Sequence, residues 1–224
     1  HFTVENSTAE VTYVLEKDQP LVRVELKVDW KEIGKDIIPV LTWQTPLSYQ
    51  TDAFRYDVPA GSTVRRGIKN DVPGLRYGMA LRMDGSSAIL VSDSKYGWDK
   101  PDDNTLRLTL LHTPETDKDY AYQNRQDFGH HCFTYSLVGH AGGLDKAVTI
   151  EKAEILNQKL KAFRTDKHRG TLGKEFSFVS SNNRNVIIKA LKKAENSDEY
   201  VVRVYEIGGE KVQDAGVFFF WGEQ

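Results

Sequence analysis

The chain has 224 residues, of which 39% are hydrophobic and 28% charged, so it has enough apolar content to bury a core. Its 30 lysines and arginines nearly balance 32 aspartates and glutamates, which gives a formal net charge of −2. This balance provides no field that would attract a polyanion, and no basic run is interleaved with aromatics, so nucleic acid is not expected as a partner. No stretch approaches the roughly 18 consecutive apolar residues that cross a bilayer, so we expect a soluble segment with no membrane contact.

Cys132 is the only cysteine, which excludes an internal disulfide framework and a four-cysteine zinc site. A chain without cystines favours a reducing, cytoplasmic location over a secreted one. Cys132 has no adjacent base in the sequence and lies in an apolar run. We therefore expect its thiol to be buried and inert.

Alternation of apolar and polar residues predicts strands along most of the chain. In the clearest case one face of the strand would consist of Val22, Val24, Leu26, Val28 and Trp30. The same alternation occurs at residues 106–110 and 133–137, and runs rich in β-forming residues recur at 11–15, 87–91, 186–190, 200–205 and 217–221. Asp84 and Gly85, between two such runs, are typical of a tight hairpin. Turn-forming residues between the strands predict an all-β, mainly antiparallel fold, a large β-sandwich or supersandwich.

One segment has helical rather than strand spacing. In residues 148–160, Ala153, Leu156 and Leu160 would share one helical face, so we expect at most one short helix. The polar residues 165–171 follow, and their low apolar content is typical of a linker.

This linker separates a longer β-rich block from a shorter one. We predict a large β-sandwich domain over residues 1–168 and a smaller β domain over residues 169–224. The smaller block closes on the strongly apolar run 217–221, which a complete domain would cover. We therefore expect this sequence to be part of a longer protein.

Short motifs of this chain resemble, in order, motifs in the C-terminal region of the glycoside hydrolase family 38 α-mannosidases. They are VDWKE (28–32), YDVPAG (56–61) with the arginine pair that follows it, AILVSDSKYGW (88–98), DFGHHCFTYSLVGH (127–140) and the strand pair at 189–193 and 201–206. The fourth motif is the most specific, and it departs from the family pattern only at Gly139, where proline is common. The resemblance implies a β-sandwich region followed by a small β domain.

The resemblance also implies a zinc-dependent, retaining α-mannosidase that acts on mannose-containing oligosaccharides. In such enzymes one carboxylate attacks the anomeric carbon, a second acts as acid and base, and zinc holds sugar hydroxyls. These groups belong to the family's N-terminal catalytic domain, whose zinc ligands include a His-x-Asp motif that this chain lacks. We therefore expect the zinc and the catalytic residues in that domain of the parent protein, and no catalytic residue or metal in this segment. Oligomeric assembly stays open.

Three candidates for contact with a substrate lie in one loop. In the family this loop lies toward the catalytic domain, so Arg125, Asp127 and His131 would touch the sugar or brace a residue that does. The alternative is that a hydrogen-bonded Asp127–His131 pair only pins the loop to the sandwich. On a strand, His130 and His131 point to opposite faces, which argues against their binding one metal ion together.

Three further pocket candidates lie elsewhere in the sequence. Arg66 follows the Pro-x-Gly turn, and the aromatics Tyr96 and Trp98 flank a turn. Aromatic rings can stack on sugars, although aromatics on sandwich strands more often fill the core.

Two functions from different classes are consistent with these features. The first is a non-catalytic scaffold segment of an α-mannosidase, which helps to close a pocket built mostly by another domain. The second is a self-sufficient carbohydrate-binding β-sandwich that recognises a glycan without cleaving it. The ordered motifs favour the first.

Overall fold

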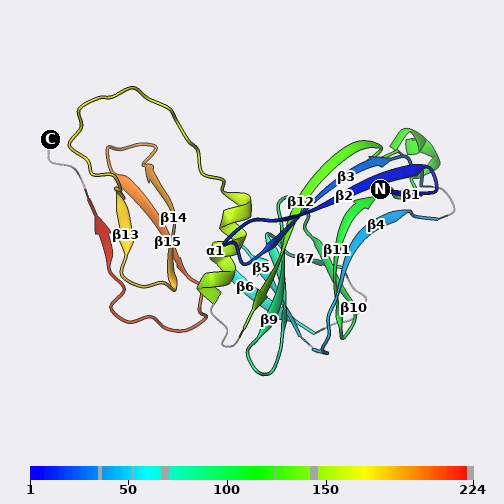
Figure 1. Ribbon diagram of the computed structural model, residues 1–224, viewed down its shortest axis with the longest axis horizontal. Coiled ribbons are helices and arrows are strands. Elements are labelled where there is room, and N and C mark those ends of the chain that lie inside the picture. Colours follow the sequence, from blue (N-terminus) through cyan, green and yellow to red (C-terminus); the bar gives the residue numbers. More distant parts are fainter. Residues whose placement is uncertain (35–36, 52, 67–70, 124, 142–145, 221–224) are drawn as a thin grey trace.

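The chain folds into stacked antiparallel sheets with one α-helix (Figure 1), as a computed structural model describes for residues 1–34, 37–51, 53–66, 71–123, 125–141 and 146–220. The all-β, antiparallel fold predicted from the sequence is confirmed. In the part described, the helices are α1 (Lys146–Asn157) and the short 3-10 helix η1 (Lys118–Gln123). No described helix is long and apolar enough to cross a membrane.

The larger sheet has eight strands in the order β1-β2-β3-β12-β9-β8-β5-β6. Their bounds are β1 (Phe2–Val4), β2 (Ser7–Leu15), β3 (Val22–Trp30), β12 (Gly129–His140), β9 (Ser87–Ser92), β8 (Tyr77–Leu81), β5 (Phe54–Val58) and β6 (Gly61–Arg65). The alternation predicted for β3 is confirmed, since Val24, Leu26, Val28 and Trp30 are at most 4% exposed. These residues face the second sheet.

The smaller sheet has four strands in the order β4-β11-β10-β7. Their bounds are β4 (Val40–Pro46), β11 (Thr105–His112), β10 (Gly97–Asp102) and β7 (Val72–Pro73). Leu106, Leu108 and Leu110 of β11 are buried, as their alternation predicts. They pack with the inner residues of β3 and β12 in one apolar core, so burial of these facing side chains holds the two sheets together.

The hairpin predicted at Asp84 and Gly85 joins β8 to β9. Gly85 has a positive φ of 82°, which glycine adopts without steric cost. The Ser86 main-chain N–H donates to Asp84 Oδ1 at 2.9 Å, which fixes the turn.

Helix α1 covers part of the outer face of the larger sheet (Figure 1). Ile150, Ala153 and Leu156 are buried against Met79, Ile89 and other residues of β8, β9 and β12. The predicted helix is therefore present. Leu160, which we placed on its inner face, lies beyond the helix end and is fully exposed.

A small unit, residues 179–220, follows an exposed connecting segment. Residues 158–178 have no helix or strand and are all exposed. In the small unit β13 (Val179–Ser181) pairs with β16 (Val217–Phe219), and β14 (Val186–Lys193) pairs with β15 (Tyr200–Glu206). The domain boundary at residues 168 and 169 falls within the connecting segment and stays a prediction.

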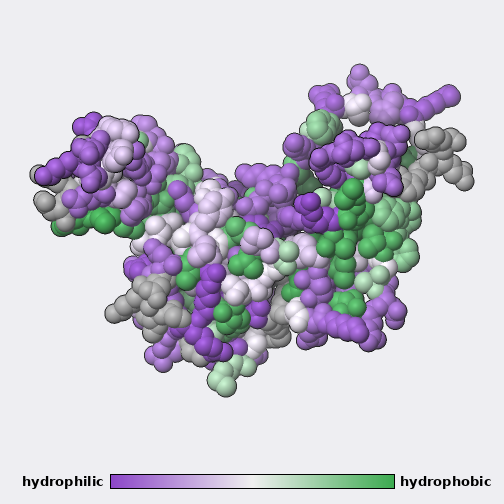
Figure 2. All heavy atoms as spheres, turned by 180° about the vertical axis from the view of Figure 1, so that it is seen from behind, coloured by the Kyte–Doolittle hydropathy of each residue, from purple (hydrophilic) through white to green (hydrophobic). Residues whose placement is uncertain are grey.

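Apolar side chains are exposed on the small unit. Phe218 and Phe220 are about half exposed, and Figure 2 shows hydrophobic residues gathered over this part of the molecule. Trp221, predicted to end the same strand, lies outside the described residues.

The expectation for Cys132 was wrong, because its side chain is exposed. Cys132 pairs with Lys27 of β3, between the inward-facing positions of β12. Since side chains alternate along a strand, burial of Phe133 places Cys132 on the opposite, solvent-facing side.

We expect Gly78→Ala to destabilise the sandwich. A Cβ at this position would lie 2.9 Å from Trp98 Cε3 and 3.1 Å from Leu106 Cδ1, and both neighbours are fully buried. Such overpacking costs about 1–3 kcal/mol, so thermal denaturation should show a lower Tm. Gly61→Ala is the control, because a Cβ there meets no atom within 4 Å. Equal melting temperatures for the two variants would contradict this packing.

Candidate functional site

The candidate site is residues 125–131, which comprise the loop that precedes β12 and the first residues of that strand, at the end of the sandwich where β3 and β11 also end. Trp30, the last residue of β3, donates from Nε1 to Thr113 Oγ1 at 2.8 Å. Thr113 is fully buried and donates in turn to the main-chain carbonyl of Gln126 at 2.9 Å. This relay of two hydrogen bonds connects the end of β3 to the loop through the residue that follows β11.

Asp127 is the centre of the loop. Its carboxylate Oδ2 accepts a hydrogen bond of 3.1 Å from the main-chain N–H of His112, the last residue of β11. Asp127 has a positive φ of 59°, and Gly129 has a φ of 125°. A Cβ at Gly129 would meet no atom, so the backbone conformation and not crowding requires glycine there.

His131 fixes the other end of the loop. Its Nε2 lies 2.6 Å from the main-chain carbonyl oxygen of Asp127. Because a carbonyl only accepts, Nε2 carries the proton. The predicted hydrogen bond between Asp127 and His131 is therefore present. It goes to the main-chain carbonyl of Asp127, whereas the Asp127 carboxylate accepts from the His112 main-chain N–H.

Cationic side chains lie next to this hydrogen-bonded frame. The Arg125 guanidinium is 5.8 Å from the ring centre of Phe128, and the Arg125 side chain is exposed. The His131 ring stacks on Phe133 with ring centres 5.8 Å apart, and Lys95 Nζ lies 4.5 Å from the centre of the same Phe133 ring. The structure thus brings Arg125, Asp127 and His131 together and adds Lys95, which we did not predict although it belongs to the Lys-Tyr-Gly motif.

The three remaining candidates differ in accessibility. Tyr96 is 56% exposed in the turn between β9 and β10, directly after Lys95. Arg66 is exposed and follows β6, the edge strand on the far side of the larger sheet from β3.

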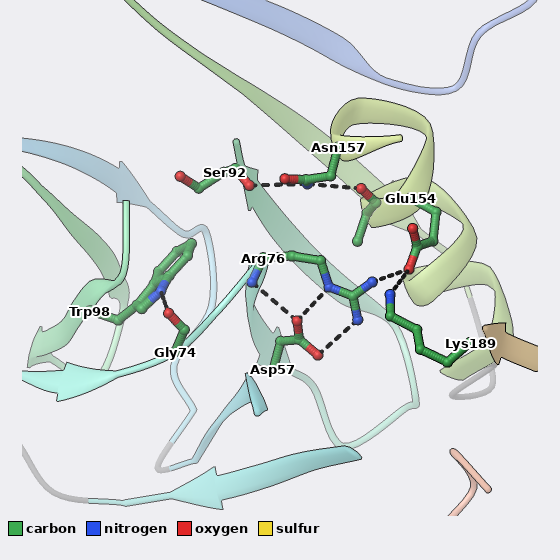
Figure 3. Close-up of polar contacts among 9 residues, drawn as sticks. Asp57, Gly74, Arg76, Ser92, Trp98, Glu154, Asn157 and Lys189 are labelled. Carbon is green, nitrogen blue, oxygen red and sulfur yellow. Dashed lines mark hydrogen bonds and ion pairs between the residues drawn. The ribbon is translucent and has the colours of Figure 1, made fainter. Parts of the chain in front are cut away.

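Trp98 is a core residue with no exposed surface. Its Nε1 donates to the main-chain carbonyl of Gly74 at 3.2 Å (Figure 3). A Cβ at Gly74 would lie 2.8 Å from Trp98 Cδ1, so the ring fills the space that this glycine leaves. In this structure neither face of the Trp98 ring is accessible to a sugar. Of the two roles considered for this residue, stacking on a sugar and filling the core, the structure shows the second.

Among the residues described, no group of three or more histidine, cysteine, aspartate or glutamate side chains is arranged to hold a metal ion. His130 Nδ1 lies 3.3 Å from Asp29 Oδ1, on the strand face opposite that of His131. Lys31 donates to Asp29 and holds the pKa of that carboxyl below its usual value. The residues that the structure describes therefore do not fit a zinc site.

Asp102 and Asp117, each followed within two residues by a second aspartate, accept main-chain hydrogen bonds in turns. Asp117 Oδ1 accepts from the Asp119 main-chain N–H at 3.1 Å, and Asp102 Oδ1 accepts from the Asn104 main-chain N–H at 3.0 Å. Both are Asx-type contacts that cap turns.

Chemically, the candidate site offers exposed hydrogen-bond donors on a fixed loop, which suits binding of hydroxyl or anionic groups.

Two family models match this chain. A model described as the glycosyl hydrolases family 38 C-terminal domain matches residues 1–120, and one described as the family's C-terminal beta sandwich domain matches residues 185–220. The first match alone covers more than half of the chain.

Similar proteins include Alpha-mannosidase G of Dictyostelium discoideum, which is 27% identical over 213 residues, or 91% of this chain and 19% of that protein. Alpha-mannosidase 2C1 of Homo sapiens is 28% identical over 218 residues, or 92% of this chain and 20% of that protein. The chain thus spans about a fifth of the length of these curated relatives. A solved alpha-mannosidase from Enterococcus faecalis V583 has the same fold, with a TM-score of 0.77 and 16% identity over 95% of this chain and 24% of that one.

We expect Thr113→Val to loosen the loop. The change removes the hydroxyl that accepts from Trp30 and donates to Gln126, which leaves buried polar groups unpaired at a cost of about 1–3 kcal/mol. The measurements are Tm and amide hydrogen exchange of residues 125–131, both of which should show destabilisation.

Thr116→Val is the matched control. Thr116 Oγ1 is buried without a hydrogen-bond partner, so the same substitution there should be neutral or slightly stabilising. If both variants behave alike, the relay through Thr113 does not hold the loop.

Proposed function

Because this chain belongs to the glycosyl hydrolase family 38 C-terminal domains, we propose that it is the non-catalytic C-terminal β-sandwich segment of a zinc-dependent, retaining alpha-mannosidase that acts on mannose-containing glycans. The family match over residues 1–120 is the observation on which this proposal depends. The relatives are alpha-mannosidases about five times as long as this chain. The remaining four fifths of such a protein would hold the catalytic machinery.

The chemistry of the candidate site supports a binding role over a catalytic one. Retaining glycoside hydrolysis needs two carboxyl groups about 5 Å apart across the sugar, one as nucleophile and one as acid and base. In and near the loop, the Asp127 carboxylate instead accepts a hydrogen bond from the His112 main-chain N–H, and Asp117 accepts one from the Asp119 main-chain N–H. We therefore propose that zinc and the two catalytic carboxylates lie in the N-terminal catalytic domain of the parent protein.

In this proposal the loop at residues 125–131 contributes to the pocket of that domain. Arg125 would donate to a sugar hydroxyl or to a carboxylate of the catalytic domain, and the Asp127 carboxylate and the His131 ring would touch the sugar or brace a residue that does. The loop is fixed at three points, by Thr113 to Gln126, His112 to Asp127 and His131 to Asp127. A loop fixed in this way would present Arg125 without a large ordering cost when substrate binds.

The second candidate function is a carbohydrate-binding module that works without a catalytic domain. Exposed aromatic rings next to the loop favour it, since Tyr120 and Tyr122 are 54% and 75% exposed with ring centres 6.4 Å apart. Such rings can stack on sugars. Binding of methyl α-mannoside by this chain alone, measured by calorimetry, would favour this second function.

We expect Asp127→Asn, His131→Gln and Arg125→Met in the full-length enzyme to lower kcat/KM by about tenfold or more, which corresponds to about 1.4 kcal/mol of transition-state stabilisation. Asparagine keeps an oxygen for the His112 N–H and glutamine keeps a donor for the Asp127 carbonyl, so the melting temperature should change little. Steady-state kinetics and thermal denaturation are measured on the same samples.

Lys192→Met serves as the control, because Lys192 makes an exposed ion pair with Glu195 within the small unit. It should leave both quantities unchanged. A lower Tm with normal kcat/KM per folded molecule in the loop variants would show that the loop is scaffold only and would refute the pocket role.

A further inference from the structure

Arg76 connects parts of the chain that are far apart in sequence (Figure 3). Its main-chain N–H donates to Asp57 Oδ2 at 3.1 Å, and its guanidinium Nε donates to the same oxygen at 2.7 Å. Nη2 donates to Asp57 Oδ1 at 3.2 Å. Asp57, in β5, is 1% exposed, so Arg76 neutralises a buried carboxylate of the larger sheet with a two-pronged contact.

The other side of the guanidinium faces away from the sheet. Arg76 Nη1 forms an ion pair with Glu154 of helix α1. The same glutamate oxygen, Oε1, lies 3.1 Å from Lys189 Nζ of β14. Tyr205 of β15 lies close enough to Arg76 to contribute to the raised pKa of its guanidinium. We call Asp57, Arg76, Glu154 and Lys189 the Arg76 cluster.

The charge of Arg76 is constant at ordinary pH. Burial alone would lower its pKa, but the hydrogen bonds and charges of Asp57 and Glu154 outweigh burial and raise the pKa above the usual value. Glu154 therefore always faces a cation on the sheet side, and its second cation, Lys189, comes from the small unit.

Helix α1 and the β14–β15 hairpin are attached to the sandwich in different ways. The helix has its own contacts, since Ala153 and Leu156 are buried and Asn157 Nδ2 donates to the Ser92 main-chain carbonyl at 3.1 Å. Among the described residues of the hairpin, Ile187 and Tyr205 pack against the same apolar cluster, which also includes the buried Ile207 that follows β15. The chain that leads to the small unit, residues 158–178, is exposed throughout.

We propose that Arg76 is a positioning residue that holds the β14–β15 hairpin on the sandwich through Glu154, so that the Arg76 cluster, and not the connecting segment, sets the orientation of the small unit. The carboxylate of Glu154 bridges one cation from each side. Without the Glu154 carboxylate, the positive charges of Arg76 and Lys189 would repel each other. The hairpin would then lose this ionic link and keep its apolar contact with the sandwich and the exposed connecting segment. This inference does not depend on the proposed enzymatic function.

The test removes the charges of Glu154 and Lys189 from the Arg76 cluster in the full-length protein. Arg76→Met would leave the buried Asp57 carboxylate without its counter-charge and unfold the sandwich, so Glu154→Gln and Lys189→Met are used. Amide hydrogen exchange is compared between residues 186–206 of the hairpin and residues 22–30 of β3. Glu154→Gln should speed exchange in the hairpin about fivefold or more and leave β3 unchanged. Unchanged exchange in the hairpin would overturn the proposal.

Two further variants separate positioning from a general loss of stability. Glu10→Gln, on β2, makes the same change to a carboxylate that lies 3.6 Å from His1 Nε2, outside the Arg76 cluster, and it should have no effect on the hairpin. The double variant Glu154→Gln/Lys189→Met should be no worse than Glu154→Gln alone, because Lys189 acts through Glu154. Faster exchange in β3 as well as in the hairpin, or additive effects in the double variant, would show a merely structural role and overturn the proposal.

Discussion

The antiparallel pairing of β3 with β12 determines the position of most other features. The two strands pair from Val22 opposite Leu137 to Trp30 opposite Gly129. In this register Val24 and Tyr135 point into the core together, and at the end of the pair Trp30 reaches Thr113. A shift by one residue would turn the apolar set to solvent and remove the partner of the Trp30 indole.

The same pairing locates the candidate loop. Because β12 begins opposite the last residue of β3, residues 125–128 must cross the end of the sandwich next to β11. Three hydrogen bonds then fix them, from Thr113 to Gln126, from His112 to Asp127 and from His131 to Asp127. On its other edge β12 pairs with β9, and the turn that follows β9 brings Lys95 over Phe133. The position of Lys95 beside β12 is thus a consequence of strand order.

The sequence predicted what depends on local pattern. Alternation located β3, β11 and β12, and Asp84-Gly85 located a hairpin, because strand faces and tight turns are decided by residues a few positions apart. The alternation around Cys132 also contained the information that its thiol is exposed, but we gave more weight to the residue type. Leu160 was misplaced because helical spacing does not show where a helix ends.

What the sequence did not predict depends on contacts between distant residues. The Arg76 cluster joins positions 57, 76, 154 and 189, and the Trp30 relay joins positions 30, 113 and 126. A pattern that repeats every few residues does not reveal contacts between positions so far apart in the sequence. The role of His131 was foreseen in outline, but its partner is the Asp127 carbonyl, which side-chain chemistry alone does not reveal.

We propose that this chain contributes a fixed loop to a sugar pocket built by another part of a longer enzyme. The most direct measurement is a crystal structure of the full-length protein with a mannose-like inhibitor bound. We expect the loop at residues 125–131 to border the inhibitor, with Arg125 within hydrogen-bond distance of the sugar or of a catalytic-domain residue that contacts it. A structure in which the inhibitor is bound and this loop faces open solvent, remote from the catalytic domain, would contradict that claim.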